Sequence, residues 1–427
     1  MMKKLLCCVT ALCILLTLCL TTGLAEEKTV VRMAVSGSVS EIALREETAN
    51  LYMELHPDVE IKWIDLGDDR VVKTMALISS GEAPDILYMN ENIYTYTTRG
   101  VLEPLTQYIE AEGEGYLDYF YDSLLAPLTY EGELYALPQE VSPYVIYYNK
   151  DLFDRYGVEY PTNDWTFDQW YETCRKLAHP DELVYAENIM AWADKFLQQL
   201  SRMGVEIYTD DMQGIWTAQP ENYDKALAAF EWLNNAVAVE HICPDPAEQT
   251  AMGKGFSEMF RNQQVAMEAS GLWSLPPYKD DPLTFSWDVV MSPLSQDGSR
   301  TTRAGILNWG IYSGSKNKEA AWDVLKFFVG HEGQKIVAKY NMALPGAQDD
   351  EANQMIIDSR FPESVKNFVD SVPFIEIQDS FSLCEDEVNN LLTAQLQSMI
   401  LGEQTPQEAL DNFNEEAVEI LKEAIEG

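Results

Sequence analysis

The segment from Lys73 to Asn92 predicts a helix, a turn and a buried strand in immediate succession. Its helical spacing ends at Gly81, and an apolar run typical of a strand begins soon after Pro84. In an open α/β sheet, ligands bind just beyond the carboxyl ends of the strands, so the polar residues after this strand are expected at a cleft. Those residues are Asn90, Glu91 and Asn92. The segment has no nucleophile motif, glycine fingerprint or metal cluster, which favours binding over chemistry.

The residues before this segment predict the first unit of a mostly parallel sheet. Thr29 to Val35 and Val59 to Ile64 have strand-like composition, and the stretch Glu41 to Leu55 between them is helical. Strand, helix and strand with short polar joints form the pattern of a βαβ unit. Ser38 lies in the turn before this helix, where its hydroxyl is expected either to cap the helix or to bind a polar ligand.

The first twenty-five residues have the pattern of a secretory signal peptide. Two lysines precede an apolar run from Leu5 to Leu20, and the small residues Gly23 and Ala25 follow it. The run is shorter than the ~18 residues that a membrane-spanning helix needs, so cleavage after Ala25 is expected in preference to an uncleaved anchor. A lipid anchor at Cys19 is not expected, because leucine precedes this cysteine where lipoprotein signals carry a small residue. The mature chain is expected outside the cytoplasm, in a periplasm, at the cell surface or secreted.

The charge balance excludes one class of partner. The chain has 29 Lys and Arg against 70 Asp and Glu, a net charge of −41, so it lacks the basic patch that nucleic-acid binding needs. The acids are scattered and not grouped at ligand spacing, which indicates a well-solvated monomer. Outside the signal region only Cys174, Cys243 and Cys384 remain. They have no CxxC partners, allow at most one disulfide, and predict neither a zinc site nor another cofactor.

The length of the chain is sufficient for two domains. Pro138 and Pro143 flank a short polar segment that is expected to cross between domains and to act as a hinge. Thr166, with Gln169 three residues later, predicts a helix capping box. Further short strands are predicted at residues 144–148, 264–268, 287–291 and 305–312, of which the last is expected to return the chain to the first domain.

Six motifs in a fixed order carry a family resemblance: SSGEAPDIL, YEGELYALP, YYNKDLFDRYG, YPTNDWTFDQW, FRNQQVAMEASGLW and SGSKNKEAAWDVLKFFVGHEGQ. Over about residues 30–345 the chain resembles bacterial family 1 extracellular solute-binding proteins, the sugar-capturing subunits of ABC importers that include maltose-binding protein. The resemblance implies a two-lobed α/β fold of the type II periplasmic-binding-protein class, in which each lobe is a mostly parallel sheet flanked by helices. It implies a first lobe of residues 28–139 plus 291–345 and a second of residues 140–290 plus 346–427, joined by a hinge.

The resemblance also implies which residues contact the ligand. Trp273 follows Gly271-Leu272 at the end of a predicted strand, where the family's Gly-x-Trp tryptophan stacks on a sugar ring; a buried core tryptophan is the structural alternative. Ser142 and Tyr144, at the hinge crossing, match positions that touch ligand. The remaining candidates are Asn90 to Asn92 at the strand end, Ser38 in its turn, Asn308 and Trp309 on the returning strand, and Trp192 and Asp194 before a helix.

The expected function is the extracytoplasmic substrate-binding component of an ABC importer, which captures a sugar or oligosaccharide and delivers it to a membrane permease. A non-sugar solute, such as a polyamine, a metal complex or a peptide, is the alternative within binding proteins. A secreted glycoside hydrolase is the alternative among enzymes, and it would need two carboxylates roughly 5–10 Å apart across the scissile bond. No strand-end carboxylate motif stands out, so neither enzymatic activity nor a catalytic residue is expected.

Overall fold

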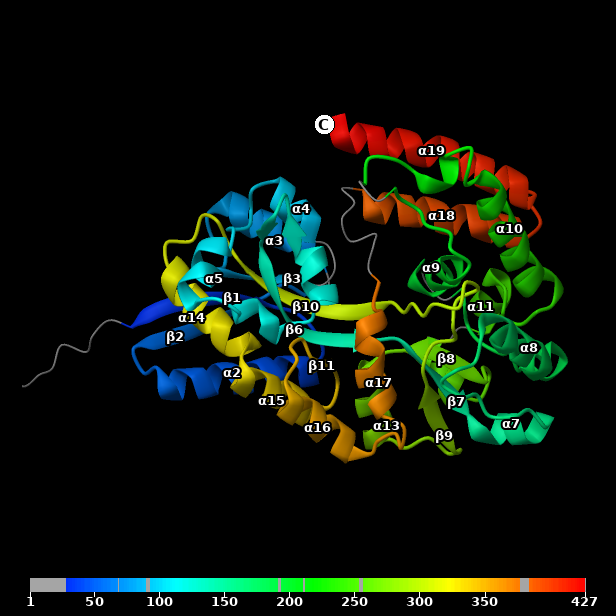
Figure 1. Cartoon of the computed structure of the whole chain (residues 1–427), viewed down its shortest axis with the longest axis horizontal. Coiled ribbons are helices and arrows are strands. Elements are labelled where there is room, and N and C mark those ends of the chain that lie inside the picture. Colours follow the sequence, from blue (N-terminus) through cyan, green and yellow to red (C-terminus); the bar gives the residue numbers. More distant parts are fainter. Residues whose placement is uncertain are drawn as a thin grey trace, which may run out of the picture.

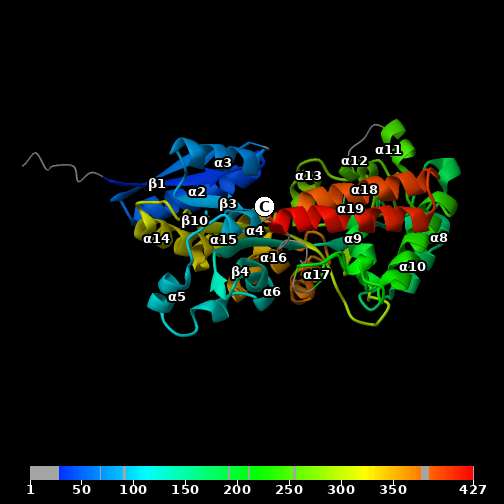
Figure 2. The ribbon, with the colours of Figure 1, turned by 90° about the horizontal axis from the view of Figure 1, so that it is seen from above.

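The computed structural model describes residues 28–67, 69–89, 93–190, 193–209, 212–252, 256–376 and 384–426. The predicted signal peptide and Cys19 lie outside these residues. Two α/β lobes lie side by side along the long axis of the molecule and are joined near its middle (Figures 1 and 2). No helix within the described ranges is long and apolar enough to cross a membrane.

The first lobe is built on a sheet that contains six of the described strands. In spatial order these are β11 (Leu344–Pro345), β6 (Ala136–Pro143), β10 (Ala304–Ile311), β3 (Ile86–Met89), β1 (Thr29–Val35) and β2 (Val59–Asp65). Strand β1 pairs in parallel with β2 and β3, and helix α2 (Val39–Leu55) connects β1 to β2. The predicted βαβ unit is therefore confirmed.

The described strands of the second lobe form a smaller sheet in the order β8 (Met267–Ser270), β7 (Val145–Asn149) and β9 (Trp287–Val290). Both pairings are antiparallel, as are those of β10 with β3 and β6. The prediction of mostly parallel sheets is wrong in this respect. β7 carries the chain away from the segment that crosses between the lobes, whereas β8 and β9 carry it back. β7 therefore runs opposite to both. The same constraint makes β6, which approaches the crossing, antiparallel to β10, which leaves it.

Helices cover both sheets. Around the first sheet lie α2, α3 (Arg70–Ser80), α4 (Ile93–Thr98), α5 (Thr106–Glu112), α6 (Asp122–Leu125), α14 (Lys318–Val329), α15 (His331–Tyr340) and α16 (Asp350–Ser359). β4 (Thr129–Tyr130) and β5 (Glu133–Leu134) pair as a short antiparallel hairpin. Around the second sheet lie α7 (Lys150–Tyr156), α8 (Phe167–Leu177), α9 (Ala193–Arg202), α10 (Tyr223–Asn234), α11 (Pro246–Met252), α12 (Phe256–Arg261), α13 (Leu275–Asp280), α17 (Lys366–Ser371), α18 (Glu385–Ile400) and α19 (Pro406–Glu426).

A local sequence signal explains where helix α8 begins. Helix α8 begins at the predicted capping box: Thr166 Oγ1 accepts from the Gln169 N–H at 3.2 Å, and Gln169 Oε1 accepts from the Thr166 N–H at 2.8 Å. The two bonds satisfy backbone donors that have no partner within the helix. This prediction is confirmed.

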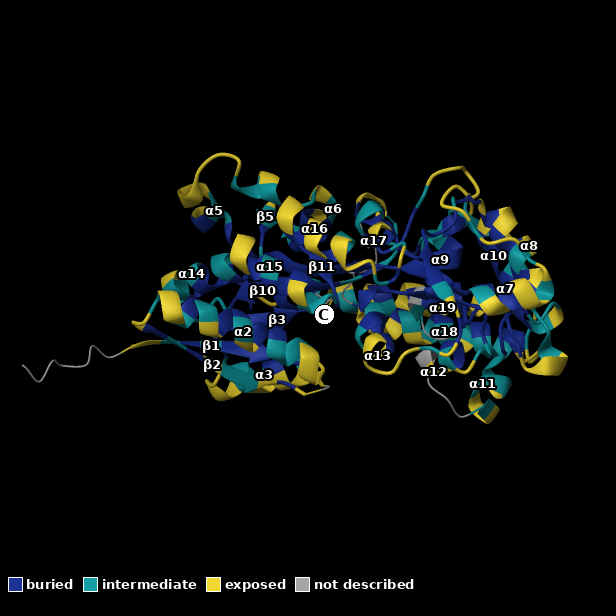
Figure 3. Ribbon diagram, turned by 90° about the horizontal axis from the view of Figure 1, so that it is seen from below, coloured by how far each residue is buried: buried dark blue, intermediate teal, exposed yellow. Residues whose placement is uncertain are grey.

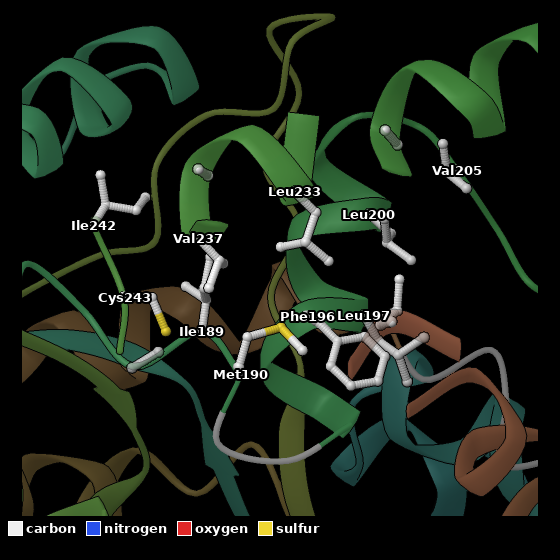
Figure 4. Packing of buried hydrophobic residues seen from close by; sticks show 14 of the residues in the cluster. Ile189, Met190, Phe196, Leu197, Leu200, Val205, Leu233, Val237, Ile242 and Cys243 are labelled. Atoms are coloured by element: carbon white, nitrogen blue, oxygen red, sulfur yellow. The ribbon is translucent and has the colours of Figure 1, made fainter. Parts of the chain in front are cut away.

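Each lobe has its own apolar core. In the second lobe, Phe196 and Leu200 of α9 meet Leu233 of α10 and Val237 of the π-helical turn that follows it (Figure 4). Cys174, Cys243 and Cys384 are buried in the same core, and none of the three forms a disulfide among the described residues. The core of the first lobe lies against its sheet, and buried residues continue through the strands that link the lobes (Figure 3). The predicted residue limits of the lobes stay a prediction.

Three segments of the described chain run side by side between the lobes. The Tyr144 N–H donates to the Arg303 carbonyl at 2.8 Å, which joins the β6–β7 crossing to the start of β10. The Thr302 N–H donates to the Phe374 carbonyl at 2.8 Å, and the Glu376 N–H donates to the Thr302 carbonyl at 3.0 Å. Pro138 to Pro143, the predicted hinge, forms part of β6, so the chain leaves the first sheet only after Pro143. Hinge motion at this point stays a prediction.

Candidate ligand-binding site

The strands β6 and β10 bring polar and small residues to one face where the lobes meet. Gly305 lies opposite Ser142, and Leu307 lies opposite Glu140. Side chains alternate between the two faces of a strand, so Glu140 and Ser142 point to the same side, toward which Gly305 presents no side chain. We call this face, formed by Glu140, Ser142 and Gly305, the floor of the candidate site.

Trp273 lies over this floor. It belongs to a 3-10 turn, Leu272–Ser274, that follows β8, and its side chain is 37% exposed. A β-carbon added at Gly271 would be 2.2 Å from Trp273 Cζ3, and one added at Gly305 would be 2.9 Å from it. The indole therefore needs a glycine at both positions. Its exposure shows that Trp273 is not a core residue.

Ser142 and Tyr144 hold the Trp273 turn in place. The Ser142 hydroxyl accepts a hydrogen bond from the Leu272 N–H at 2.6 Å. The Tyr144 ring meets the Trp273 ring edge-on, with centroids 5.5 Å apart and an angle of 78° between their planes. The ammonium of Lys195, in the first turn of α9, lies 5.4 Å from the centroid of the Tyr144 ring. Ser142 and Tyr144 are both buried in this arrangement, so they position the indole.

A buried ion pair lies on the first-lobe side of the same floor. Arg45 on α2 is 1% exposed; its guanidinium donates to the Ser36 carbonyl at 3.1 Å and to Glu140 Oε1 at 3.3 Å. It also lies 5.1 Å from the centroid of the Tyr88 ring. Burial raises the pKa of Glu140, and the nearby Arg45 opposes this change. The pair is a charge-assisted hydrogen bond between α2 and β6.

A second buried carboxyl lies on the second-lobe side, at Glu268 of β8. Burial raises its pKa to about 7, the charge of Lys195 acts in the opposite direction, and Glu187 adds to the increase. Burial therefore favours the protonated form of Glu268 more than that of an exposed glutamate. Among the described residues, no group of three or more His, Cys, Asp or Glu side chains could hold a metal ion.

The other predicted residues occupy different positions. Ser38 caps α2: its hydroxyl accepts from the Glu41 N–H at 3.4 Å, and Glu41 Oε2 accepts from the Ser38 N–H at 2.6 Å. Asn308 and Trp309 are both 0% exposed in the first sheet, where the Trp309 indole donates to Gln139 Oε1 at 2.6 Å. The structure does not bring these two residues to the exposed edge of Trp273.

Four predicted residues lie outside the described residues, namely Asn90, Glu91, Asn92 and Trp192. Asp194 lies in α9, but its side chain is not among the described parts of the chain. All of these remain predictions.

Sequence reasoning missed Arg45, Glu140, Lys195, Glu268 and Gly305. A signal for Glu140 was present, since it stands two residues before Ser142 on one strand and must share its face. Arg45 has no such signal, because the pairing with Glu140 joins residues 95 positions apart. Gly305 is required only because the Trp273 ring approaches it from another part of the chain.

Comparisons with known proteins agree with this architecture. The chain is 22% identical over 442 residues to the galactooligosaccharide-binding protein of Bacillus subtilis, covering 98% of this chain and 97% of that protein. An ABC substrate-binding protein from Listeria monocytogenes in complex with cycloalternan is 25% identical, with a TM-score of 0.78, and the match covers 91% of this chain and 98% of that chain. The cyclic alpha-maltosyl-1,6-maltose binding protein from Arthrobacter globiformis has a TM-score of 0.79 at 18% identity, covering 93% and 100%.

These structures confirm the predicted two-lobed fold of the type II class. The family model described as bacterial extracellular solute-binding protein matches residues 37–335, which is most of the chain. The chain therefore belongs to the bacterial extracellular solute-binding proteins.

Proposed function

We propose that this protein is the substrate-binding component of an ABC importer and that it captures an oligosaccharide between its lobes. The observation that carries the proposal is the partly exposed indole of Trp273, which rests on two glycines at the junction of the lobes. Sugars present flat apolar ring faces, and an aromatic ring held in a fixed orientation provides a stacking surface for them. The relative named galactooligosaccharide-binding protein and the solved structure in complex with cycloalternan support this ligand class.

Charged residues on the strands and helices that support the Trp273 turn suit the hydroxyls at the edges of a sugar ring. Glu140 and Arg45 lie on the first-lobe side of the floor, and Lys195 and Glu268 lie on the second-lobe side. Carboxylates accept hydrogen bonds from hydroxyls, and guanidinium and ammonium groups donate to them. A ligand between the lobes would therefore contact both, and closure of the lobes around it would give the permease a distinct shape to recognise.

We further propose that the predicted signal peptide exports the chain and that it works as a monomer beside its permease. The net charge of −41 favours separate molecules through self-repulsion. We also propose that the protein performs no catalysis: the family to which it belongs consists of binding proteins, and the Trp273 site is built around a stacking surface.

Calorimetric titration and thermal unfolding of the mature protein test the proposal. The ligands are galacto-oligosaccharides, linear and cyclic α-gluco-oligosaccharides, their monosaccharides, and spermidine as a non-sugar solute. An oligosaccharide is expected to bind and to raise the unfolding temperature, because a ligand of the native state stabilises it. Stabilisation by spermidine, with no response to any saccharide, would show that the ligand class is wrong.

Two variants test whether Trp273 itself contacts the oligosaccharide. Trp273→Ala is expected to weaken oligosaccharide binding by about 10- to 100-fold, since the loss of a stacking surface removes roughly 1.5–3 kcal/mol of binding free energy. Tyr160→Ala is the matched control, because Tyr160 is also an exposed aromatic residue, at 43%, but packs near Phe153 away from the crossings. Equal affinities of the two variants would remove Trp273 from the site.

A further inference from the structure

Tyr144 is held by its backbone and by its ring at the crossing between the lobes. Its N–H donates to the Arg303 carbonyl at 2.8 Å. Its carbonyl accepts from Thr302 Oγ1 at 2.7 Å and from Ser292 Oγ at 3.2 Å. Its ring meets the Trp273 indole edge-on. Any contact that fixes Tyr144 therefore also fixes the support of the indole.

Helix α9 contacts Tyr144 through two residues that lie one turn apart. Lys195 places its ammonium 5.4 Å from the centroid of the Tyr144 ring, which is within the range of a cation–π interaction. The Gln198 amide donates to Ser292 Oγ at 3.3 Å and to Thr302 Oγ1 at 3.2 Å. These are the two hydroxyls that donate to the Tyr144 carbonyl. Residues three apart on a helix are neighbours, so one face of α9 holds both the ring and the backbone of Tyr144.

Both residues of α9 are buried, which is unusual for polar side chains of this length. Lys195 is 3% exposed and Gln198 is 1% exposed. A buried ammonium loses its hydration, and a lysine is rarely buried unless its partners compensate for this loss. The charge of Lys195 opposes the increase in pKa that burial causes at Glu268, so the ammonium also interacts with this carboxyl. A carboxyl and an aromatic ring together restrict the position of the lysine side chain.

We propose that Lys195 and Gln198 are positioning residues of the candidate site. They act through Tyr144, which holds the Trp273 ring in the orientation that stacks on a sugar. This inference rests on the proposed function, since it concerns the same site. A lysine that served only as an ion-pair partner of Glu268 would stabilise the second lobe without changing the Trp273 ring. The two roles therefore differ in a measurement on the indole itself.

Fluorine NMR of the mature protein labelled with fluorotryptophan observes the ring directly. The resonance of Trp273 is identified by its absence from Trp273→Phe. In ligand-free Lys195→Met this resonance is expected to shift or broaden, because the ring gains other orientations. Lys195→Arg keeps the cation and is expected to restore most of the wild-type signal. Lys150→Met is the matched control, because Lys150 pairs with a carboxylate and lies 5.9 Å from the centroid of the Tyr148 ring, at the opposite end of β7 from the Trp273 turn.

Calorimetric titration tests the consequence for binding, with whichever galacto-oligosaccharide or α-gluco-oligosaccharide binds wild type. Lys195→Met is expected to weaken binding about tenfold and Lys195→Arg less than about threefold, because stacking depends on the orientation of the ring. In the Trp273→Ala background, Lys195→Met is expected to cause no further loss. Thr302→Val removes one hydroxyl between Gln198 and Tyr144, and it is expected to weaken binding about threefold. Thr302→Ser keeps this hydroxyl and should keep the affinity.

Each result decides one point. An unchanged Trp273 resonance in folded Lys195→Met, or an equal change in Lys150→Met, would overturn the positioning role. A further loss of affinity when Lys195→Met is added to Trp273→Ala would also overturn it, since Lys195 would then act by another route. If no oligosaccharide binds wild type, the proposed function fails, but the fluorine spectra still decide the role of Lys195. Circular dichroism establishes folding, and the Trp273 resonance in the two Thr302 variants decides the result if Lys195→Met does not fold.

Discussion

The indole of Trp273 lies directly against the backbone of Gly305, so closely that a β-carbon on Gly305 would be 2.9 Å from Trp273 Cζ3. Gly305 belongs to β10, whereas Trp273 follows β8 in the other lobe, so this contact joins the two lobes. Gly305 has no positive φ. The position requires glycine because of space and not because of backbone conformation.

Replacement of Gly305 by valine is therefore expected to displace the Trp273 ring. Oligosaccharide affinity should fall about tenfold, because stacking depends on the orientation of the ring. The measurement is a double-mutant cycle by calorimetry with Trp273→Ala. In the Trp273→Ala background, Gly305→Val is expected to have no further effect on affinity. Additive losses would mean that Gly305 acts independently of the ring.

Removal of the Arg45 charge is expected to destabilise the first lobe. Arg45→Met leaves the Glu140 carboxylate buried without its cation, which costs about 3–5 kcal/mol. The double variant Arg45→Met with Glu140→Gln should recover part of this loss, since no charge then remains buried. Urea unfolding of the ligand-free protein measures the free energy of unfolding of the single and the double variant. A double variant less stable than Arg45→Met would contradict the explanation.

Glu268 predicts a pH dependence of stability with a defined sign. Its pKa in the folded protein is raised to about 7, whereas the pKa of an unfolded glutamate is about 4.3. The folded state binds this proton more tightly, so the contribution to stability is fully present below about pH 4 and is lost as pH rises through about 7. Between about pH 4 and pH 7, the free energy of unfolding of wild type should fall by on the order of 2–3 kcal/mol relative to that of Glu268→Gln.

Urea unfolding at pH 5, 6, 7 and 8 checks this difference. The comparison with Glu268→Gln removes the contributions of other titrating groups, while the charges that face Glu268, namely Lys195 and Glu187, are present in both proteins. The stability of the variant minus that of wild type should increase with pH. A constant difference would contradict the raised pKa.

Ser38 is expected to stabilise α2 through its cap. Ser38→Ala should lower the free energy of unfolding by about 1 kcal/mol, and Ser38→Asp should retain most of it, because aspartate caps as well as serine. Oligosaccharide affinity should change less than twofold in both variants. A tenfold loss of affinity in Ser38→Ala alone would assign its exposed hydroxyl to the ligand.

The parts of the fold that depend on neighbouring residues could be predicted. The βαβ unit and the Thr166 capping box follow from periodicity and from side chains three residues apart, and both are present. Strand direction beyond β3 depends on the crossings, which pair residues more than a hundred positions apart. Local pattern carries no information about such pairings, so the antiparallel strands were not predicted.

Local sequence pattern was also insufficient to predict which residues of β10 belong to the candidate site. Gly305 and Trp309 lie four residues apart on β10, but Gly305 lies at the crossing whereas Trp309 lies beneath Phe328 of α14, with ring centroids 5.9 Å apart. Alternation predicts which face of a strand a residue occupies, but not where along the strand a helix begins to cover it. Trp273 could be singled out because the chain resembles a family whose Gly-x-Trp tryptophan stacks on a sugar ring; that its ring is partly exposed is a finding of the structure.

The central position of β10 has a consequence for biosynthesis. This strand, Ala304–Ile311, joins β3 on one side to β6 on the other, so the first sheet is two separate fragments until it is in place. A ribosome makes about three-quarters of the chain before β10 emerges, and long-range pairings of this kind form slowly. The growing chain thus cannot complete either side of its first lobe early, which would favour the export before folding that we propose for this chain.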